Sequence, residues 1–378
     1  MPNYGLVLTG GGARGAYQAG VLKAISEIYA GKPFPFNVIT GVSAGSINGL
    51  AFACGIHNHE WASEKLWQVW ANLQISQVFD VHATAFLRIG SNMLKDIVLG
   101  GLLKKKNSAF LLNTDPLREL LKENIDFRFL EHNLKTKKLH GISVTCTNYY
   151  SGSSITFFDG DDSIENWLRN QRLSRRETLT LDHVMASTSI PLLFPPVKVA
   201  GSYYGDGGVR LSAPLSPAIH LGAEKILTIG VRRFRPFETS IEMTNKPIDR
   251  ISIAEISGVM LNAIFTDSLE SDIERLERIN RTIERAQNTK SPNDHELRVI
   301  PHMVIRPSED LGNMAATQFK NFPRILRYLM RGVGASNKKG SDFLSYIAFD
   351  KNYTEKLLQL GYADAMKMKD ELLLFLKT

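Results

Sequence analysis

The sequence of 378 residues contains little cysteine and no long apolar run. Its two cysteines, Cys54 and Cys146, are too few for a disulfide framework or a structural zinc site, and both lie in apolar segments where a buried thiol is expected. No stretch approaches 18 consecutive apolar residues, so we expect no transmembrane helix. Because the first residues also lack the basic region of a signal peptide, we expect a cytoplasmic protein.

The sequence also lacks a strong charge bias, internal repeats and low-complexity segments. Its net charge of +7 and isoelectric point near 9.2 are moderately basic, and the basic residues occur in several short clusters scattered along the chain. We therefore expect no nucleic-acid binding, while weak attraction to anionic lipid stays open for the basic clusters. A hydrophobic fraction of 43% is ordinary for a globular protein that buries a sizeable core.

The order of the expected elements indicates an α/β fold. Short apolar runs that end in glycine, proline or polar residues predict strands, and longer stretches with apolar residues at helical spacing predict helices. Strands that alternate with helices predict a parallel sheet with crossover helices on its faces. The strands are expected at residues 4–8, 37–40, 139–147, 154–158 and 225–231, and the helices at residues 15–29 and 44–54, with further helical patterning over 57–129.

The pattern changes after about residue 235. Apolar residues recur at helical spacing from 256 to 286, which predicts one long amphipathic helix. One last strand is expected at 299–306, and the remainder is mostly helical, including 353–360 and 363–376. We therefore predict a catalytic unit over residues 1–235 and a mostly helical C-terminal extension over 236–378 that packs on it, with 236–250 as the most linker-like stretch.

Gly10, Gly11 and Gly12 begin a glycine-rich turn between the first strand and the first helix, which continues through Arg14 to Gly15. Backbone N–H groups at such a turn can hold a phosphate or a developing oxyanion. The run also fits the dinucleotide-binding pattern G-x-G-x-x-G, but the next strand ends without the acidic residue that would hold a ribose. The alternatives to an oxyanion-binding role for this turn are nucleotide binding and a purely structural role.

Gly41, Ser43 and Gly45 form a G-x-S-x-G pentapeptide, again between a strand and a helix. In this context the flanking glycines permit a sharp turn that lifts the serine hydroxyl above the sheet, as in a nucleophile elbow. The alternative is a serine that only caps the following helix.

A serine nucleophile needs a base, and the sequence offers two kinds. The late histidines His295 and His302 would suit a triad, but neither lies in a persuasive loop motif. Asp206 lies between glycines after a short extended segment, where it presents a carboxylate on a turn that another backbone can approach. A simple Asp-Gly hairpin turn is the alternative for Asp206.

Taken together, GGGARG at 10–15, GVSAG at 41–45 and DGG at 206–208 resemble the patatin-like phospholipase family. The ASTSIP segment at 186–191 and the following FPPV also resemble that family's loop before the aspartate. The resemblance covers residues 4 to about 231, and the C-terminal part is similar to the helical extension of bacterial cytosolic members. It implies a three-layer α/β core with a parallel sheet.

The resemblance further implies a Ser–Asp dyad without a catalytic histidine. Ser43 would be the nucleophile and Asp206 the base. The N–H groups of Gly10, Gly11 and Gly12 would form the oxyanion hole, supported by Arg14. The family's motif often begins with aspartate, where this chain has Thr9, but the backbone supplies the chemistry.

The implied reaction is cleavage of ester-linked fatty acids from phospholipid or lysophospholipid through an acyl-enzyme. Neither cofactor nor metal is expected, and no acidic calcium loop is recognisable. The expected partner is a lipid substrate at a membrane surface, with a homodimer as a further possibility. An acyltransferase on the same site and a non-catalytic lipid-binding regulatory module are the alternatives.

Two segments are candidates for lipid contact. Leu192, Leu193 and Phe194 could line an apolar acyl groove just before Asp206. Residues 97–103 are largely apolar and are followed by three lysines, which suits either an interfacial contact or a core helix with a cationic end.

Overall fold

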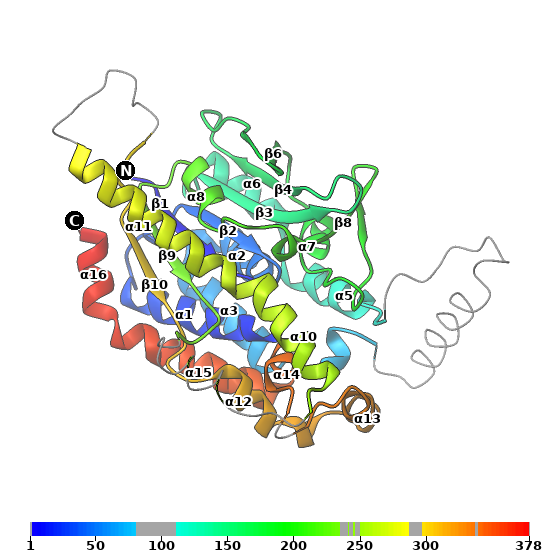
Figure 1. Cartoon of the computed structure of the whole chain (residues 1–378). Helices are drawn as coiled ribbons and strands as arrows, with labels where there is room; N and C mark the ends of the chain where they lie inside the picture. Colours follow the sequence, from blue (N-terminus) through cyan, green and yellow to red (C-terminus); the bar gives the residue numbers. More distant parts are fainter. Residues whose placement is uncertain are drawn as a thin grey trace.

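The computed structural model describes residues 2–80, 111–234, 241, 245, 250–286, 297–336 and 339–377. Its centre is a mixed, mainly parallel sheet with helices on both faces, as expected (Figure 1). The strand order is β10-β9-β1-β2-β3-β4-β6-β5, while β8 pairs with β3 and with β7. The strands are β1 (Tyr4–Leu8), β2 (Val38–Val42), β3 (Gly141–Asn148), β4 (Ser154–Gly160), β5 (Leu168–Arg169), β6 (Arg172–Arg176), β7 (Val197–Val199), β8 (Ser202–Asp206), β9 (Lys225–Ile229) and β10 (His302–Ile305).

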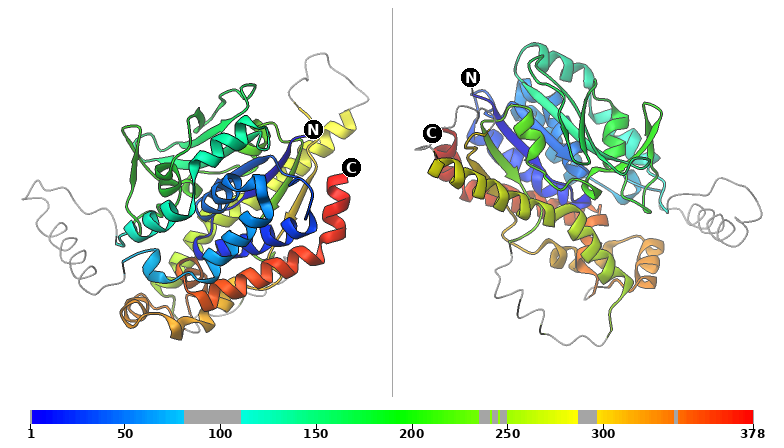
Figure 2. Two further views of the ribbon diagram at one scale, coloured as in Figure 1. Left: turned by 180° about the vertical axis from the view of Figure 1, so that it is seen from behind. Right: turned by 45° about the horizontal axis from the view of Figure 1, so that its top comes forward.

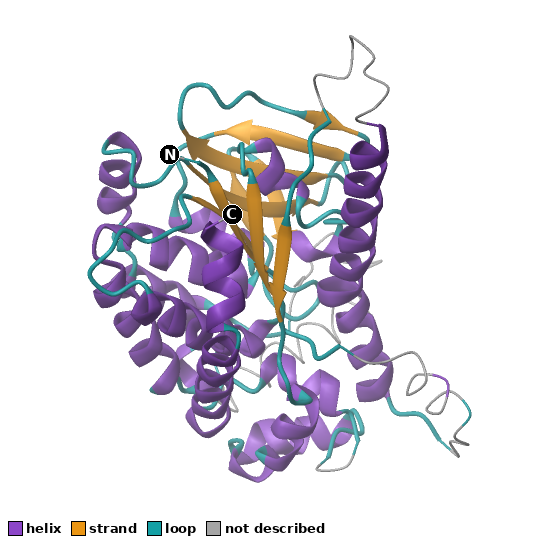
Figure 3. Cartoon of the chain, turned by 90° about the vertical axis from the view of Figure 1, so that its left-hand side faces the viewer, coloured by secondary structure: helices purple, strands orange, loops and turns teal. Residues whose placement is uncertain are grey.

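Five neighbouring strands, from β10 to β3, are parallel, and β4 and β8 pair with β3 in the antiparallel direction. Helices cover both faces of this sheet (Figure 3). The helices are α1 (Gly15–Ile28), α2 (Ala44–Cys54), α3 (His59–Ala71), α5 (Asp115–Asn124), α6 (Phe127–Lys135), α7 (Leu181–Ser187), α8 (Ser216–His220), α10 (Ile253–Asn262), α11 (Ser268–Ala286), α12 (Leu311–Thr317), α13 (Arg324–Gly332), α14 (Ser341–Ile347), α15 (Lys351–Lys367) and α16 (Lys369–Lys377).

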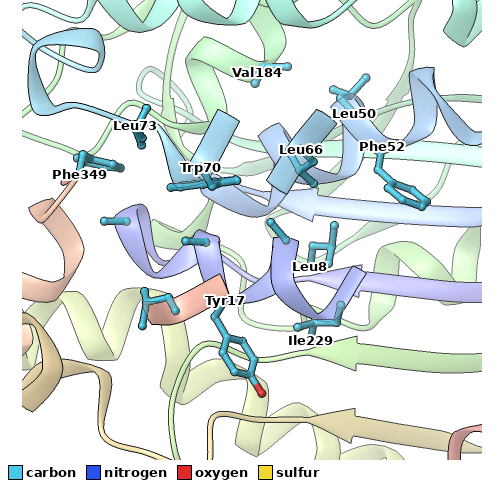
Figure 4. Close-up of a cluster of buried hydrophobic side chains, with 14 of the residues drawn as sticks. Leu8, Tyr17, Leu50, Phe52, Leu66, Trp70, Leu73, Val184, Ile229 and Phe349 are labelled. Atoms are coloured by element: carbon cyan, nitrogen blue, oxygen red, sulfur yellow. The ribbon is translucent and has the colours of Figure 1, made fainter. Parts of the chain in front are cut away.

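Alternate residues of the central strands enter two separate cores. Leu6 and Leu8 of β1 belong to the larger core, which includes the side chains of α1, α2 and α3 shown in Figure 4. Val7, between them, belongs to a smaller core under α8 and α11. This alternation follows from the two-residue period of a strand and explains why the central strands are apolar throughout.

The long helix expected over 256–286 is interrupted. A short π-helical segment, Ala263–Asp267, joins α10 to α11. Such segments occur mostly as local bulges within helices and are frequent at functional sites. Phe265 of this segment packs close to two glycines of the site described below, which is a contact that helical periodicity alone does not predict.

The C-terminal residues join the same sheet and the same core as the N-terminal ones. Strand β10 extends the sheet beside β9, and α15 packs along α1 (Figure 2). The two helix backbones touch at Gly20 and Gly361, where an added Cβ would lie 2.1 Å from a carbonyl oxygen of the opposite helix. Gly361 therefore lies inside α15, which runs without interruption from Lys351 to Lys367 and joins the helical stretches expected at 353–360 and 363–376.

Candidate functional site

The turn between β2 and α2 holds Ser43 in a strained conformation. Its φ of 53° and ψ of −129° are rare for a residue with a side chain, and such backbone strain concentrates at functional sites. A Cβ at Gly41 would lie 2.4 Å from the Gly45 carbonyl oxygen, and one at Gly45 would lie 2.2 Å from that of Leu8. Both glycines are therefore required for the elbow that the pentapeptide predicts.

Two neighbouring serines fix the backbone of this elbow. The Ser43 N–H donates to Oγ of Ser187 at 2.9 Å, and the Ser187 hydroxyl donates to the Thr145 carbonyl at 2.7 Å. Ser46, one turn further along α2, donates its hydroxyl to the Ser43 carbonyl at 2.6 Å. Ser187 lies within the motif at 186–191, but no pattern in the sequence marks it as a partner of Ser43.

Asp206 is completely buried at the end of β8, beside Ser43. Its Oδ1 accepts the Gly208 N–H at 2.9 Å, while Oδ2 has no hydrogen-bond partner among the described residues. Burial raises the pKa of Asp206 to about 7, although the Ser43 hydroxyl and the Gly208 N–H both favour the ionised form. One carboxylate oxygen is therefore available to a proton at a pKa that suits a general base near neutral pH.

The glycine-rich turn lies against the same serine. A Cβ at Gly10 would be 3.1 Å from Cβ of Ser43, and Gly12 shares the lining of one pocket with Ser43. Gly12 has a φ of 56°, and an added Cβ there would be 2.2 Å from the Tyr346 carbonyl oxygen. The N–H groups of Gly11 and Gly12 have no acceptor among the described residues, so they can stabilise an anion at this end of the pocket.

Arg14 holds this turn from behind, through contacts to the C-terminal part of the chain. Its buried guanidinium donates to Oγ of Ser345 at 2.8 Å and to Oδ1 of Asp342 at 2.9 Å. It also stacks on the ring of Tyr346, 4.1 Å from the centroid, and donates to Asn262 at 3.3 Å. The side chain is thus placed as a support for the turn, and these partners have no motif that identifies them in the sequence.

An apolar pocket of about 300 Å³ begins at Ser43 and Gly12 and runs along α2. Ser43, Ile47, Ala51 and Cys54 line it at helical spacing, which corresponds to a length of about 16 Å at 1.5 Å per residue. The opposite walls come from helices α3 and α5. Their lining side chains are Trp61, Leu66, Val69, Trp70, Leu117, Leu120 and Leu121.

The pocket differs from the groove expected at 192–194. Phe194 lines it, but Leu192 is 77% exposed and neither Leu192 nor Leu193 is among its described lining residues. The reason is the local backbone: Leu192 has a φ of 66°, and the carbonyls of Leu192 and Leu193 accept N–H groups from Leu111 and Leu112. The apolar candidates that sequence reasoning missed lie on α2, where they recur every turn after Ser43. The segment 97–106 lies outside the described residues.

His302 cannot reach Ser43. It begins β10, in register with Ile226, Gly5 and Val38, whereas Ser43 follows the other end of β2. The separation is about 16 Å along the strands and about 14 Å across three strand spacings. His295 lies outside the described residues, and none of the described residues lining the pocket is a histidine.

The part of the chain that the structure describes contains no group of three metal-ligating side chains. Within the same residues, no helix combines the length and hydropathy needed to cross a bilayer.

A sequence model described as "Patatin-like phospholipase" matches residues 6–219. The chain belongs to the patatin-like phospholipase family. This match covers β1 from Leu6 onward, the glycine-rich turn, the Ser43 elbow and Asp206, so the three motifs lie within the family's domain. Membership of the family supports a lipid acyl hydrolase activity.

Two solved structures of other proteins are similar to this patatin-like chain at low sequence identity. Human GIVD cytosolic phospholipase A2 is 13% identical with a TM-score of 0.46, and the match covers all of this chain and 60% of the human one. VipD from Legionella pneumophila is 13% identical with a TM-score of 0.34, and the match covers 98% of this chain and 67% of VipD. The chain thus spans about three fifths of the human phospholipase that it matches.

Proposed function

We propose that this patatin-like chain hydrolyses the ester-linked fatty acids of phospholipid or lysophospholipid, with Ser43 as nucleophile and Asp206 as base. The observation that carries the proposal is the buried Asp206 carboxyl, with Oδ2 unpartnered among the described residues, beside a Ser43 that lines an apolar pocket. The pocket offers an acyl chain apolar contact along the whole length of α2.

In the first step, the Ser43 hydroxyl attacks the ester carbonyl carbon and its proton passes to the Asp206 carboxylate. The negative charge that develops on the carbonyl oxygen is stabilised by the N–H groups of Gly11 and Gly12. The ester C–O bond then breaks, and the leaving alkoxide takes the proton from Asp206. The products of this step are the lysolipid or glycerophosphodiester and a fatty acyl ester on Ser43.

In the second step, a water molecule attacks the acyl ester and gives its proton to Asp206. The resulting oxyanion occupies the same two N–H groups. When the bond to the Ser43 oxygen breaks, the proton returns to Ser43 and the fatty acid leaves. Because Asp206 acts as base and then as acid in both steps, a pKa of about 7 serves both directions of transfer better than the usual value of a carboxyl group.

The proposal is tested with a fluorophosphonate probe, which labels an activated serine, and with p-nitrophenyl butyrate. The wild-type chain should be labelled and should hydrolyse the ester, while Ser43→Ala should lose both properties. Ser163→Ala is the matched control, because its hydroxyl is exposed and bonds to Asp161 after β4, and it should retain labelling. Persistent hydrolysis in Ser43→Ala would show that another residue is the nucleophile.

Lipid products distinguish the substrate classes. Mass spectrometry of phosphatidylcholine, phosphatidylglycerol and lysophosphatidylcholine after incubation should show free fatty acid in the wild type and none in Asp206→Asn. A product in which the acyl group is transferred to added glycerol would instead indicate an acyltransferase.

A further inference from the structure

Helix α10 exposes an apolar face to solvent. Its Ala254, Gly258 and Leu261 are buried, and Gly258 lies against α14. On the other side, Ile253 and Val259 are 63% and 67% exposed, and Ile256 and Met260 are also exposed. A helix that is apolar on both faces is normally buried on both. The exposed face of α10, formed by residues 253, 256, 259 and 260, therefore needs an explanation.

Helix α13 presents a basic face with an aromatic residue in it. Arg324, Arg327, Tyr328 and Arg331 recur at helical spacing, while Leu326 faces the core. Tyr328 is 74% exposed, and Arg327 donates to the Lys320 carbonyl at 2.7 Å. Arginines around an exposed aromatic ring are typical of helices that lie on a membrane surface.

The start of α10 lies beside the end of α13, beyond the carboxyl ends of the parallel strands (Figures 1 and 2). The Ala254 N–H at the start of α10 donates to the Val333 carbonyl just after α13, at 2.9 Å. Residues 250–264 and 319–332 together contain five basic residues and one acidic residue, Glu255. The Glu255 carboxylate is engaged with Ser252 at the start of α10.

The same helix leads directly into the candidate site. After α10, Phe265 packs so closely on the glycine turns that a Cβ at Gly10 or Gly208 would lie 2.6 or 2.8 Å from its ring. The exposed apolar face is thus only a few residues from the backbone around Ser43 and Asp206. This edge of the sheet is also the one at which the Ser43 elbow lies.

We propose that the exposed face of α10 and the basic face of α13 together form the surface that docks on an anionic lipid bilayer. The inference rests on the proposed lipid hydrolase function and adds the surface that brings the site to its substrate. The apolar side chains of α10 enter the interface between headgroups and acyl chains, while the arginines of α13 contact anionic headgroups. Because basic residues outnumber acidic ones in these two segments, we expect stronger binding to an anionic membrane than to a neutral one.

Vesicle co-sedimentation tests this surface with phosphatidylcholine vesicles alone and with vesicles containing about one third phosphatidylglycerol. The wild type should bind the anionic vesicles more strongly, and the difference should disappear at about 1 M salt, where the Debye length is about 3 Å. Arg324→Gln/Arg331→Gln should bind anionic vesicles about thirtyfold more weakly, because each arginine near the surface contributes about a factor of five. Ile253→Ser/Val259→Ser should weaken binding to both vesicle types at least tenfold, since it removes apolar insertion.

Matched controls come from other exposed sites. Arg278→Gln/Arg285→Gln removes two exposed arginines from the C-terminal half of α11, and Leu168→Ser/Leu297→Ser removes two exposed leucines, one in β5 and one before β10. Both control variants should bind as the wild type does. Equal loss in the test and control variants, or no vesicle binding by the wild type, would overturn the proposal.

A second copy of the chain is the competing occupant of this face. If α10 were a dimer contact, Ile253→Ser/Val259→Ser would convert a dimer to a monomer in analytical ultracentrifugation without a change in vesicle binding, which would also overturn the proposal. The outcome is separable from the hydrolase assignment. The α10 and α13 variants should retain hydrolysis of p-nitrophenyl butyrate, whereas Ser43→Ala should lose hydrolysis and still bind vesicles.

Discussion

Replacement of Asp206 by asparagine should abolish turnover and at the same time stabilise the fold at neutral pH. The carboxyl is fully buried, Oδ1 accepts one N–H and Oδ2 accepts none from the described residues. Burial raises its pKa to about 7 from an ordinary value of 3.8. An asparagine is nearly the same size, keeps a carbonyl oxygen for the Gly208 N–H and does not ionise.

The sign and size follow from proton linkage. Below about pH 4 the carboxyl is protonated in both the folded and the unfolded chain, so it contributes nothing to the pH dependence. Between about pH 4 and pH 7 the unfolded chain loses this proton while the folded chain retains it, so stability falls as the pH rises. The total loss is about 4 kcal/mol above pH 7, at about 1.4 kcal/mol per unit of pKa difference.

The free energy gained by Asp206→Asn should therefore be larger at high pH than at low pH. Between pH 5 and pH 8.5 the gain should increase by about 3 kcal/mol. For a chain of 378 residues, this corresponds to a rise of about 3 °C in the Tm difference between variant and wild type.

Thermal unfolding of both proteins from pH 5 to pH 8.5 measures this difference. Asp162→Asn, which removes an exposed carboxylate, is the control and should track the wild type at every pH. A Tm difference between Asp206→Asn and wild type that does not change with pH would refute the raised pKa. An active Asp206→Asn variant would refute its role as base.

Three further predictions concern the same site. Because Asp206 must be ionised to accept the serine proton, kcat/KM for p-nitrophenyl butyrate should fall below a midpoint near pH 7, and a midpoint near pH 4 would contradict the assignment. Ala51→Trp fills the pocket about 12 Å along α2 from Ser43, so hydrolysis of palmitoyl esters should drop at least tenfold while butyryl esters are cleaved as before; equal loss on both would place the acyl chain elsewhere. Arg14→Ala should lower the free energy of unfolding by about 3 kcal/mol, because it leaves Asp342 and Asn262 without the guanidinium that donates to both. Arg14→Lys should not restore this stability, and denaturant unfolding of the wild type and the two variants measures the difference.

The parts of the site that the sequence predicts are those that depend on local backbone geometry. Gly41 and Gly45 are required because any side chain there would collide with a carbonyl oxygen two to three ångströms away. The same holds for Gly12, which combines a positive φ with a close approach to Tyr346. Such constraints leave a mark within a few residues of sequence, so the elbow and the glycine turn were recognisable without a structure.

The pocket could not be predicted in the same way, because its walls come from three helices whose relative placement depends on packing. Leu193 is apolar and adjacent to the right motif, yet it packs against the core beside the pocket. Conversely, Ile47 looks like an ordinary core residue of an apolar helix, and only its position one turn after Ser43 marks it. Apolar character predicts burial, but it does not predict which buried surface adjoins a cavity.

The contacts that hold the glycine turn in place come from residues that are far away in the sequence. The C-terminal residues therefore contribute to the site although they carry no motif. The site combines two locally unfavourable features, which are the strained backbone of Ser43 and the buried Asp206 carboxyl. Each of these costs about 1–4 kcal/mol if taken alone. Arg14, more than 300 residues from its partners on α14, joins the turn to a part of the chain that has no catalytic motif. Interactions of this kind hold the unfavourable geometry in place, because the site is stable only as part of the whole sheet and its C-terminal helices.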